Sequence, residues 1–337
     1  MKKCILCLLI VCSGFMLFGC KKDKLKKITL VEVARSVFYA PQYVAINKGY
    51  FEEEGIKIDL INANGADKVT AALLSGDAQI GLQGPEPTIY LYKNNRTNYL
   101  INFAQLTRTD GSFIFGRNPI DNFTLADLKG KTILGGRKGG VPEMTLEYVL
   151  KQAGLDVGQD DPTKEVNVRT DVAFAAMAGS FLDGEGDFVT LFEPTATALV
   201  KENKAYLLGA VADYTGEITY TAYSTSIKYF NENKEIIEKF TRALYKGQQF
   251  VEKASDEEIA KEIHGFFSDI DLNDLVEVVK RYRSINAWKF SPVFSEEGFN
   301  RLQDIMITAG ELDTKVDYQV LVDTTIAKKV TNEKDER

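Results

Sequence analysis

Two glutamates of this chain stand next to prolines, just after short apolar runs. Glu86 lies between two prolines in the stretch IGLQGPEPT, residues 80–88, and Glu193 also precedes a proline. Proline fixes its own φ and restricts the residue before it, so each carboxylate is expected to keep one direction. A carboxylate accepts hydrogen bonds from N–H and O–H groups, which makes both residues candidates for ligand binding. The alternative for Glu86 is a solvent-facing carboxylate that complements the positive end of a helix.

Aromatic and amide side chains near other segment ends could supply more of a binding site. Phe38 and Tyr39 follow a β-rich run, and their rings could stack on a flat ligand or pack inside the protein. Gln83 and Gln105 end β-rich runs, where their amides could orient a polar edge of a ligand. Tyr223 lies near an expected connection between two halves of the molecule.

Small residues mark a further part of the candidate site. Gly139 and Gly140 let a negatively charged group approach the backbone, and the helix expected after them would present free N–H groups. Thr145 could add a hydroxyl, and Gly84, which ends the run before Glu86, belongs to the same set of candidates. An ordinary glycine-rich turn is the alternative explanation for the glycines.

The elements that must position these residues follow an α/β order. β-rich runs alternate with helical patterns from residue 28 to about 226, and mostly helical sequence follows to about 309. Ligands of open α/β sheets bind beyond the carboxyl ends of the strands, where each turn leads into a helix N-terminus. Four such strand-to-helix turns contain most of the candidates, at residues 35–41, 83–88, 137–145 and 192–195.

The same pattern predicts two lobes that face each other across these turns. Lobe one is expected to contain residues 28–113 and 223–325, and lobe two the inserted residues 117–219. Two extended hinge strands, near residues 113–117 and 220–224, would join them. The predicted fold class is therefore α/β, with two lobes, a cleft and two hinge strands.

The first twenty residues have the features of a secretory leader. Two lysines precede a mostly apolar run of 16 residues that ends at Cys20, and all four cysteines lie in this part of the chain. The pattern resembles a bacterial lipoprotein signal peptide, residues 1–19, which is cut before a cysteine that then carries the lipid, including palmitate. Residues 20–27 would be the lipidated cysteine and a polar tether. A retained membrane helix is the alternative, although roughly 20 apolar residues are needed to span a bilayer.

Several motifs together resemble a known family. They are FYAPQYVAINKGYFEEEGIKIDLI at residues 38–61, ALLSGDAQIGLQGPEPT at 72–88, LKGKTI at 128–133, GGVPEMTLEYVLKQAGL at 139–155 and FEP at 192–194. This combination resembles the solute-binding proteins of ABC importers, in the branch that serves sulfonates, taurine and the pyrimidine precursors of thiamine. The resemblance implies the periplasmic-binding-protein type II fold. It also implies a lipid-anchored, extracytoplasmic protein that delivers a small molecule to a permease and its ATPase.

Other function classes have less support. The same fold resembles the fungal-type thiamine-pyrimidine synthase, which uses its own histidine and a cysteine cluster with iron, but the sole histidine here, His264, lies in a charged helical stretch. No cysteine follows Cys20, and no metal motif is present. The net charge of −7 argues against a nucleic-acid partner. We therefore expect a monomeric binding protein without enzyme activity, cofactor or metal; a sensor or adhesin on the same fold is a weaker alternative.

Two ligand classes compete for the predicted site. An aminopyrimidine offers N–H groups to carboxylates and a flat face to aromatic rings, which suits the acidic and aromatic residues of the turns. A sulfonate requires N–H groups and arginine instead, and nearby carboxylates repel it. Arg35, Arg108 and Arg137 lie near the turns and keep the sulfonate alternative open. The sequence favours a neutral or cationic aromatic ring.

Overall fold

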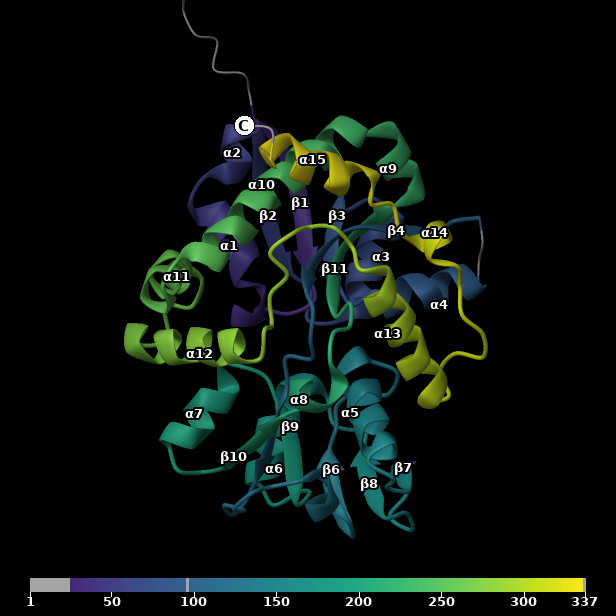
Figure 1. Ribbon diagram of the computed structural model, residues 1–337, viewed down its shortest axis with the longest axis vertical. Helices are drawn as coiled ribbons and strands as arrows, with labels where there is room; N and C mark the ends of the chain where they lie inside the picture. Colours follow the sequence, from purple (N-terminus) through teal and green to yellow (C-terminus); the bar gives the residue numbers. More distant parts are fainter. Residues whose placement is uncertain (1–24, 95–96, 336–337) are drawn as a thin grey trace, which may run out of the picture.

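The computed structural model describes residues 25–94 and 97–335, which form two α/β lobes (Figure 1). The expected signal peptide and Cys20 lie outside these residues. Each lobe is built on its own sheet, and two separate parts of the chain form lobe one. In the part of the chain that is described, no helix combines the length and apolar character needed to cross a membrane. The predicted α/β class with two lobes is confirmed.

Lobe one contains a five-stranded sheet in the order β2-β1-β3-β11-β4. β1 pairs in parallel with β2 and β3, as expected for strands that are joined through helices. β11 runs antiparallel to both of its neighbours, because the chain enters it on returning from lobe two. The strands are β1 (Lys26–Glu32), β2 (Ile56–Asn62), β3 (Ile80–Gln83), β4 (Leu100–Thr107) and β11 (Thr221–Ser226).

The helices of lobe one pack around this sheet, and α10 contacts α1, α2 and α15. α10 approaches α1 closely at Gly247, where a Cβ atom would lie 2.3 Å from the carbonyl oxygen of Pro41. The helices are η1 (Val37–Tyr39), α1 (Ala40–Asn47), α2 (Tyr50–Glu53), α3 (Ala66–Ser75), α4 (Glu86–Asn94), α9 (Ile227–Glu232), α10 (Lys234–Lys253), α11 (Asp256–Ile263), η4 (His264–Phe266), α12 (Leu272–Ser284), α13 (Glu296–Thr308), α14 (Tyr318–Leu321) and α15 (Thr325–Asp335).

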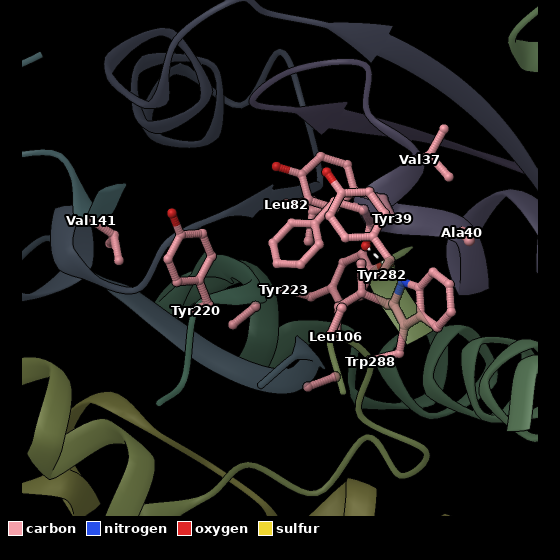
Figure 2. Close-up of a cluster of buried hydrophobic side chains, with 14 of the residues drawn as sticks. Val37, Tyr39, Ala40, Leu82, Leu106, Val141, Tyr220, Tyr223, Tyr282 and Trp288 are labelled. Atoms are coloured by element: carbon pink, nitrogen blue, oxygen red, sulfur yellow. Dashed lines mark hydrogen bonds between the residues drawn. The ribbon is translucent and has the colours of Figure 1, made fainter. Parts of the chain in front are cut away.

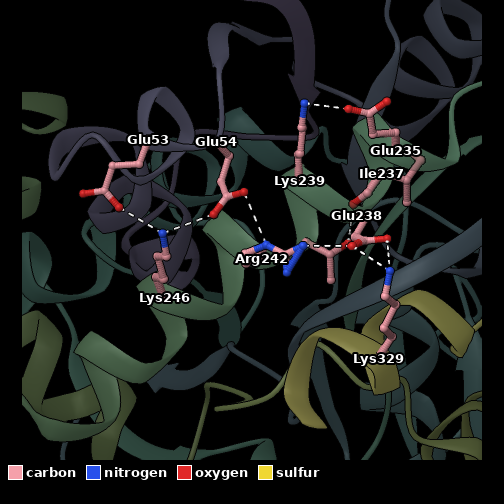
Figure 3. A network of polar contacts seen from close by, with 10 residues as sticks. Glu53, Glu54, Glu235, Ile237, Glu238, Lys239, Arg242, Lys246 and Lys329 are labelled. Carbon is pink, nitrogen blue, oxygen red and sulfur yellow. Dashed lines mark hydrogen bonds and ion pairs between the residues drawn. The ribbon is translucent and has the colours of Figure 1, made fainter. Parts of the chain in front are cut away.

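A network of ion pairs joins α10 to the end of α2 and to α15 (Figure 3). Arg242 donates to Glu238 at 2.8 Å and to Glu54 at 3.3 Å, and Lys246 donates to Glu54 at 3.2 Å. Lys329 donates to the carboxylate of Glu238 at 2.8 Å. Partly exposed pairs of this kind each contribute about 1 kcal/mol or less to the free energy of unfolding. The network therefore aligns the C-terminal helix with α10 at a modest gain in stability.

Lobe two contains a six-stranded sheet in the order β10-β5-β9-β6-β8-β7. β6, β7, β8 and β9 run parallel, and β5 is antiparallel to both β9 and β10. The strands are β5 (Phe113–Gly116), β6 (Lys131–Leu134), β7 (Val157–Gln159), β8 (Val166–Arg169), β9 (Phe188–Leu191) and β10 (Tyr206–Ala210). The helices are η2 (Leu125–Leu128), α5 (Val141–Gln152), η3 (Phe174–Ala176), α6 (Met177–Leu182), α7 (Thr195–Lys201) and α8 (Ala212–Thr215).

Two chain crossings connect the lobes, and both lie before the positions predicted from the sequence. Residues 113–116 form β5 in the sheet of lobe two, so the expected limit of lobe one at residue 113 is wrong, and the first crossing is residues 108–112. The second crossing, residues 216–220, ends where β11 begins. The crossings run side by side, since the N–H of Ile218 donates to the carbonyl oxygen of Arg108 at 2.9 Å.

Candidate functional site

The two lobes are in direct contact around the crossings. The bonds that join them come from the strand-to-helix turns of both sheets and from the C-terminal helices of lobe one. Three of these bonds end on a backbone carbonyl oxygen. The hydroxyl of Ser36 donates to the carbonyl oxygen of Glu193 at 3.2 Å, and the hydroxyl of Tyr90 donates to the carbonyl oxygen of Gly139 at 3.1 Å. The ammonium group of Lys151 donates to the carbonyl oxygen of Thr308 at 3.0 Å. The structure therefore corresponds to a closed arrangement of the lobes.

Five aromatic rings from both lobes and from a crossing meet between the lobes, and we call them the interlobe cluster. They are Phe38, Tyr39, Phe192, Tyr220 and Tyr282 (Figure 2 shows three of them). The ring centroid of Phe38 lies 5.1–6.0 Å from those of the other four. Rings at these separations attract one another beyond their buried area. The cluster forms an apolar, aromatic lining between the lobes.

Phe38 and Tyr39 were predicted as stacking residues, and the structure places both in this cluster. The backbone of Gly111 lies against the face of Phe38, because a Cβ atom on that glycine would lie 2.8 Å from the ring. Phe38 is 1% exposed and Tyr39 5%, so both rings pack inside the protein in the closed arrangement. Burial, followed by the charges of Glu32 and Glu86, raises the pKa of the Tyr39 hydroxyl. Stacking on a ligand stays a prediction for both.

Glu86 begins α4 and points into the interior between the lobes. It is 3% exposed, and its Oε2 atom has no hydrogen-bond partner among the described residues. Burial raises the pKa of its carboxyl group to about 7, against the opposing effects of its own backbone N–H and of Arg137. Unpartnered buried carboxyl oxygens are uncommon, and they indicate a missing partner such as water or a ligand. The alternative of a solvent-facing Glu86 is therefore wrong.

Gly84 makes room for this carboxyl group. A Cβ atom on Gly84 would lie 1.9 Å from the Oε2 atom of Glu86 and 3.0 Å from a methyl group of Val141, at the start of α5 in lobe two. The Glu86 side chain consequently folds over the backbone of Gly84 and lies close to lobe two. The residue type at position 84 thus decides where the carboxyl group can go.

A second acidic residue in this region, Asp110, was missed in the sequence. It lies on the first crossing, is fully buried, and accepts hydrogen bonds from the N–H and hydroxyl of Ser112 through Oδ1. Its Oδ2 atom and the hydroxyl of Tyr220 have no hydrogen-bond partner in the part of the structure described. The hydroxyl of Tyr220 interacts with the carboxyl group of Asp110 and shifts its pKa, although the two groups do not reach the distance and angle of a normal hydrogen bond. Burial raises the pKa of Asp110 to about 7.

Glu193, the other predicted carboxylate, has a full set of partners. It forms an ion pair with Arg281 of α12, and its oxygens accept the N–H of Thr197 at 2.8 Å and the hydroxyl of that residue at 3.0 Å. Its own N–H donates to the hydroxyl of Tyr282 at 3.1 Å. Since α12 belongs to lobe one and Glu193 to lobe two, these bonds hold the lobes together. Contact of its carboxylate with a ligand stays a prediction that would require one of these partners to be displaced.

The predicted glutamines use their amides within lobe one. Gln83 accepts a hydrogen bond from Thr70 at 3.3 Å, and Gln105 donates to the carbonyl oxygen of Thr107 at 3.0 Å. The amide oxygen of Gln105 also accepts the N–H of Ser295 at 2.9 Å. Gln105 thus anchors the segment before α13.

Tyr223 takes part in a different polar network, at the carboxyl end of β1. Its hydroxyl donates to Gln42 at 2.9 Å, and the amide of Gln42 donates to Glu32 at 2.9 Å. Glu32 is fully buried and also receives hydrogen bonds from Tyr43 and Arg35. The network holds the turn between β1 and η1, which carries two rings of the interlobe cluster.

In the predicted anion-binding turn of lobe two, the backbone N–H groups already donate to acceptors of the protein itself. The N–H of Gly139 donates to Glu143 at 3.0 Å, and the N–H of Gly140 donates to the carbonyl oxygen of Arg137 at 3.1 Å. The hydroxyl of Thr145 donates to the carbonyl oxygen of Val141 at 2.6 Å, within α5. The positive φ of 71° at Gly139 explains the glycine there.

Two of the three arginines that were predicted to lie near the strand-to-helix turns are paired with glutamates. Arg35 donates to Glu32 at 2.5 Å, and Arg108 forms an ion pair with Glu217 on the other crossing. Arg137, the remaining arginine of the three, is exposed on lobe two. The unpartnered oxygen atoms of the site therefore belong to acidic or hydroxyl groups, which suits a ligand with hydrogen-bond donors.

A cavity of about 380 Å³ lies elsewhere in lobe one, between β4 and the C-terminal helices. Ile101, Tyr318 and Lys328 are among its lining residues, and no member of the interlobe cluster is. The polar lining atoms of this cavity include none of the unpartnered oxygens described above. The interlobe cluster is therefore the better candidate for a functional site.

Comparisons with known proteins give a consistent result. The model of a family described as NMT1/THI5 like matches residues 37–258, a range that contains Phe38, Glu86, Asp110, Glu193 and Tyr220. The chain is 39% identical over 321 residues to YtlA of Bacillus subtilis, which is provisionally named a binding protein, and the match covers 95% of each chain. It is 22% identical over 291 residues to the formylaminopyrimidine-binding protein of Halalkalibacterium halodurans, covering 78% of this chain and 86% of that one.

A solved structure shows the shared fold. The alkanesulfonate-binding protein SsuA of Xanthomonas axonopodis pv. citri, bound to MOPS, superposes with a TM-score of 0.69 at 18% identity. The superposition covers 89% of this chain and 98% of that chain. The two-lobed periplasmic-binding-protein fold is thus confirmed for this chain.

Proposed function

Because the chain belongs to the NMT1/THI5-like family, we propose that it is the substrate-binding component of an ABC importer, which captures a small molecule between its two lobes. The observation that carries the proposal is the Oε2 atom of Glu86, which is buried between the lobes without a partner. A buried polar atom of this kind costs about 1–3 kcal/mol, and a ligand that donates a hydrogen to it would remove that cost. The two crossings would act as a hinge, and bending there would open the lobes so that a ligand can enter between them.

The proposed ligand is a thiamine pyrimidine precursor or a similar aromatic heterocycle. The aromatic rings of the interlobe cluster suit a flat ring, and the acidic groups suit its amino hydrogens. The formylaminopyrimidine-binding relative supports this ligand class. Closure of both lobes around the ligand would exclude water and strengthen each hydrogen bond to a carboxyl group.

A sulfonate or taurine-type anion is the alternative ligand, supported by the likeness to an alkanesulfonate-binding protein. An anion would meet the carboxyl group of Glu86. Arg35 is already paired with Glu32, and Arg108 is paired with Glu217, although its Nε atom has no hydrogen-bond partner among the described residues. Burial raises the pKa of Glu86 and Arg137 opposes this rise, so an anion would have to compete with that carboxyl group for the positive charge of Arg137. Like charges that are buried together repel one another strongly. The acidic site therefore favours the heterocycle.

An enzyme of the thiamine-pyrimidine synthase type is a further alternative. Against it, His264 lies in η4 at the end of α11, and its ring nitrogen is 3.0 Å from the carbonyl oxygen of Ile270. Among the described residues, no group of histidine, cysteine, aspartate and glutamate side chains is arranged to hold a metal ion. We therefore favour binding without catalysis.

The remaining parts of the proposal concern location and partners. The lipoprotein pattern that ends at Cys20 supports anchoring at the outer face of the cell membrane through a lipid on that residue. From there a monomer would deliver its ligand to a permease and its ATPase. No role is proposed for nucleic acid, cofactor or metal.

Titration calorimetry with two ligand classes tests the function. The probes are 4-amino-5-hydroxymethyl-2-methylpyrimidine and ethanesulfonate, a sulfonate without an ammonium group, and the proteins are the wild type and Glu86→Gln. The substitution keeps the size of the side chain but replaces the carboxylate, whose hydrogen bond to the ligand is worth roughly 1.5–3 kcal/mol. We expect affinity for the pyrimidine to fall by about ten- to a hundred-fold.

The control is Glu52→Gln, which changes the same charge on the exposed surface of α2. It should bind the pyrimidine like the wild type. Ethanesulfonate binding that is retained or strengthened in Glu86→Gln would instead support the sulfonate alternative. A wild-type protein that binds neither probe contradicts both ligand classes.

A further inference from the structure

Asp110 has a structural role that occupies only one of its two carboxyl oxygens. The Oδ1 atom accepts the N–H of Ser112 at 2.7 Å and the hydroxyl of the same residue, so it fixes the turn of the first crossing. The Oδ2 atom is buried and has no partner in the described part of the chain. An asparagine could fix the same turn through its amide oxygen. The turn alone therefore does not explain a fully buried aspartate.

The unpartnered oxygen of Asp110 lies in the same region as that of Glu86. Tyr220, on the second crossing, is 4% exposed, and its ring centroid lies 5.5 Å from that of Phe38. Burial, followed by the charges of Asp110, Tyr39 and Glu86, raises the pKa of its hydroxyl, which agrees with this placement. The glycine next to Asp110 contacts the ring of Phe38. Asp110 thus borders the interlobe cluster from the hinge side, whereas Glu86 borders it from α4.

Resting on the proposed function, we propose that Asp110 is a second ligand-binding residue, whose Oδ2 atom accepts a hydrogen from a different donor of the ligand than the one bound by Glu86. The two carboxyl groups belong to different elements, and each has one oxygen left without a partner. A ligand that satisfies both needs two separate donor groups. An aminopyrimidine with a hydroxyl or N–H on its substituent has this chemistry, whereas a simple anion has not.

Calorimetry on the purified protein with a pair of pyrimidines tests this assignment. 4-Amino-5-hydroxymethyl-2-methylpyrimidine has two donor groups, and 4-amino-2,5-dimethylpyrimidine lacks the hydroxyl. We expect Asp110→Asn and Glu86→Gln each to weaken the two-donor probe by about ten- to a hundred-fold. With the one-donor probe, only one of the two variants should still lose affinity, because the donor of the other carboxyl group is gone.

Ser112→Ala is the matched control. It removes a hydrogen bond to Oδ1 of Asp110 and leaves Oδ2 untouched, so its affinity for the two-donor probe should stay within about threefold of the wild type. Circular dichroism and melting curves without ligand show whether each variant is folded. A folded Asp110→Asn protein is expected, since the asparagine can keep the bonds to Ser112.

Three results would overturn the proposal. Asp110→Asn could bind the two-donor probe like the wild type, both acidic variants could keep their full loss with the one-donor probe, or Ser112→Ala could lose as much affinity as Asp110→Asn. Each of these requires that the wild type binds, so the proposed function survives them. A wild type that binds neither pyrimidine contradicts the proposed ligand class, and this assignment fails with it.

Discussion

Two buried carboxyl groups determine the chemistry of the site. Burial raises the pKa of Glu86 and of Asp110 to about 7 each, so a part of each group is protonated near neutral pH. A hydrogen-bond donor in the ligand stabilises the ionised form and lowers these pKa values again. Ligand binding is therefore coupled to proton release.

This coupling predicts a pH dependence of affinity. Below the raised pKa of about 7 of Glu86, the free protein must lose a proton before it can accept the ligand's hydrogen, so apparent affinity for 4-amino-5-hydroxymethyl-2-methylpyrimidine should rise from pH 6 to pH 8. One group contributes at most about tenfold per pH unit. Calorimetry at several pH values measures the slope. Because the ligand ring also titrates, the informative quantity is the difference from Glu86→Gln, whose slope should be smaller. Equal slopes would mean that Glu86 keeps its proton when the ligand binds.

Site residues could be predicted from the sequence where neighbouring residues mark them. The prolines beside Glu86 marked it, and the structure places it between the lobes. Asp110 and Tyr220 lacked such a signal, because they meet only when the two crossings come together from distant parts of the chain. The partners of Glu193 were missed for the same reason, since Arg281 is 88 residues away in the sequence.

At the scale of elements, the four predicted strand-to-helix turns are confirmed. Each of β1, β3, β6 and β9 is followed by a helix that begins within the residue range predicted for its turn. Pro41 and Pro142 lie in the first turns of α1 and α5. β7 and β10 were missed. β7 has three residues, and both are edge strands whose residues are mostly exposed or half-buried, so neither shows the pattern of a buried strand. The first crossing was misplaced although Asp110-Gly111 is a turn signal, because the β-rich residues after it were assigned to the hinge and they form β5 of lobe two.

α5 contains a pair of buried acidic residues at the boundary with lobe one. Glu143 is fully buried and Glu147 is 1% exposed. Burial, the hydrogen bond and charge of Glu147, and the charge of Glu311 raise the pKa of Glu143 to about 9, against the N–H of Gly139. Lys151 donates a hydrogen bond to Glu147 at 2.8 Å.

The raised pKa of Glu143 predicts a loss of stability at alkaline pH. The folded state holds a proton that the unfolded state releases above its ordinary value of 4.5, so the free energy of unfolding should fall as pH rises from about 5 towards 9. Glu143→Gln cannot titrate and should be more stable than the wild type at pH 8, by about 1 kcal/mol or more. Urea unfolding at pH 5.5 and pH 8 measures this. Parallel pH profiles of both proteins would rule out Glu143 as the source, and Glu52→Gln serves as the exposed control.

At the scale of the whole molecule, the lobes are joined only by two crossings and by non-covalent contacts. The lobes should therefore open and close as hinged bodies. A ligand favours the closed form only through contacts that it makes with both lobes, such as those with Glu86 of lobe one and with the ring of Phe192 of lobe two. The ion pair between Arg281 and Glu193 acts in the same direction without a ligand.

Small-angle scattering tests this motion. We expect the radius of gyration to decrease when 4-amino-5-hydroxymethyl-2-methylpyrimidine saturates the protein. Arg281→Ala removes the ion pair to Glu193, so without ligand this variant should have a larger radius than the wild type, and ligand should reduce the difference. One radius for both proteins, with and without ligand, would show that the lobes do not move.

The bonds between the lobes also have a kinetic consequence. Ser36, Tyr90 and Lys151 each donate a hydrogen bond to the opposite lobe, so the protein's own groups contribute to closure. A captured molecule can escape only after these bonds break, and its residence time is therefore set partly by residues that never touch it. A receiving permease that pulled the lobes apart would break the same bonds, and delivery would then be faster than spontaneous escape.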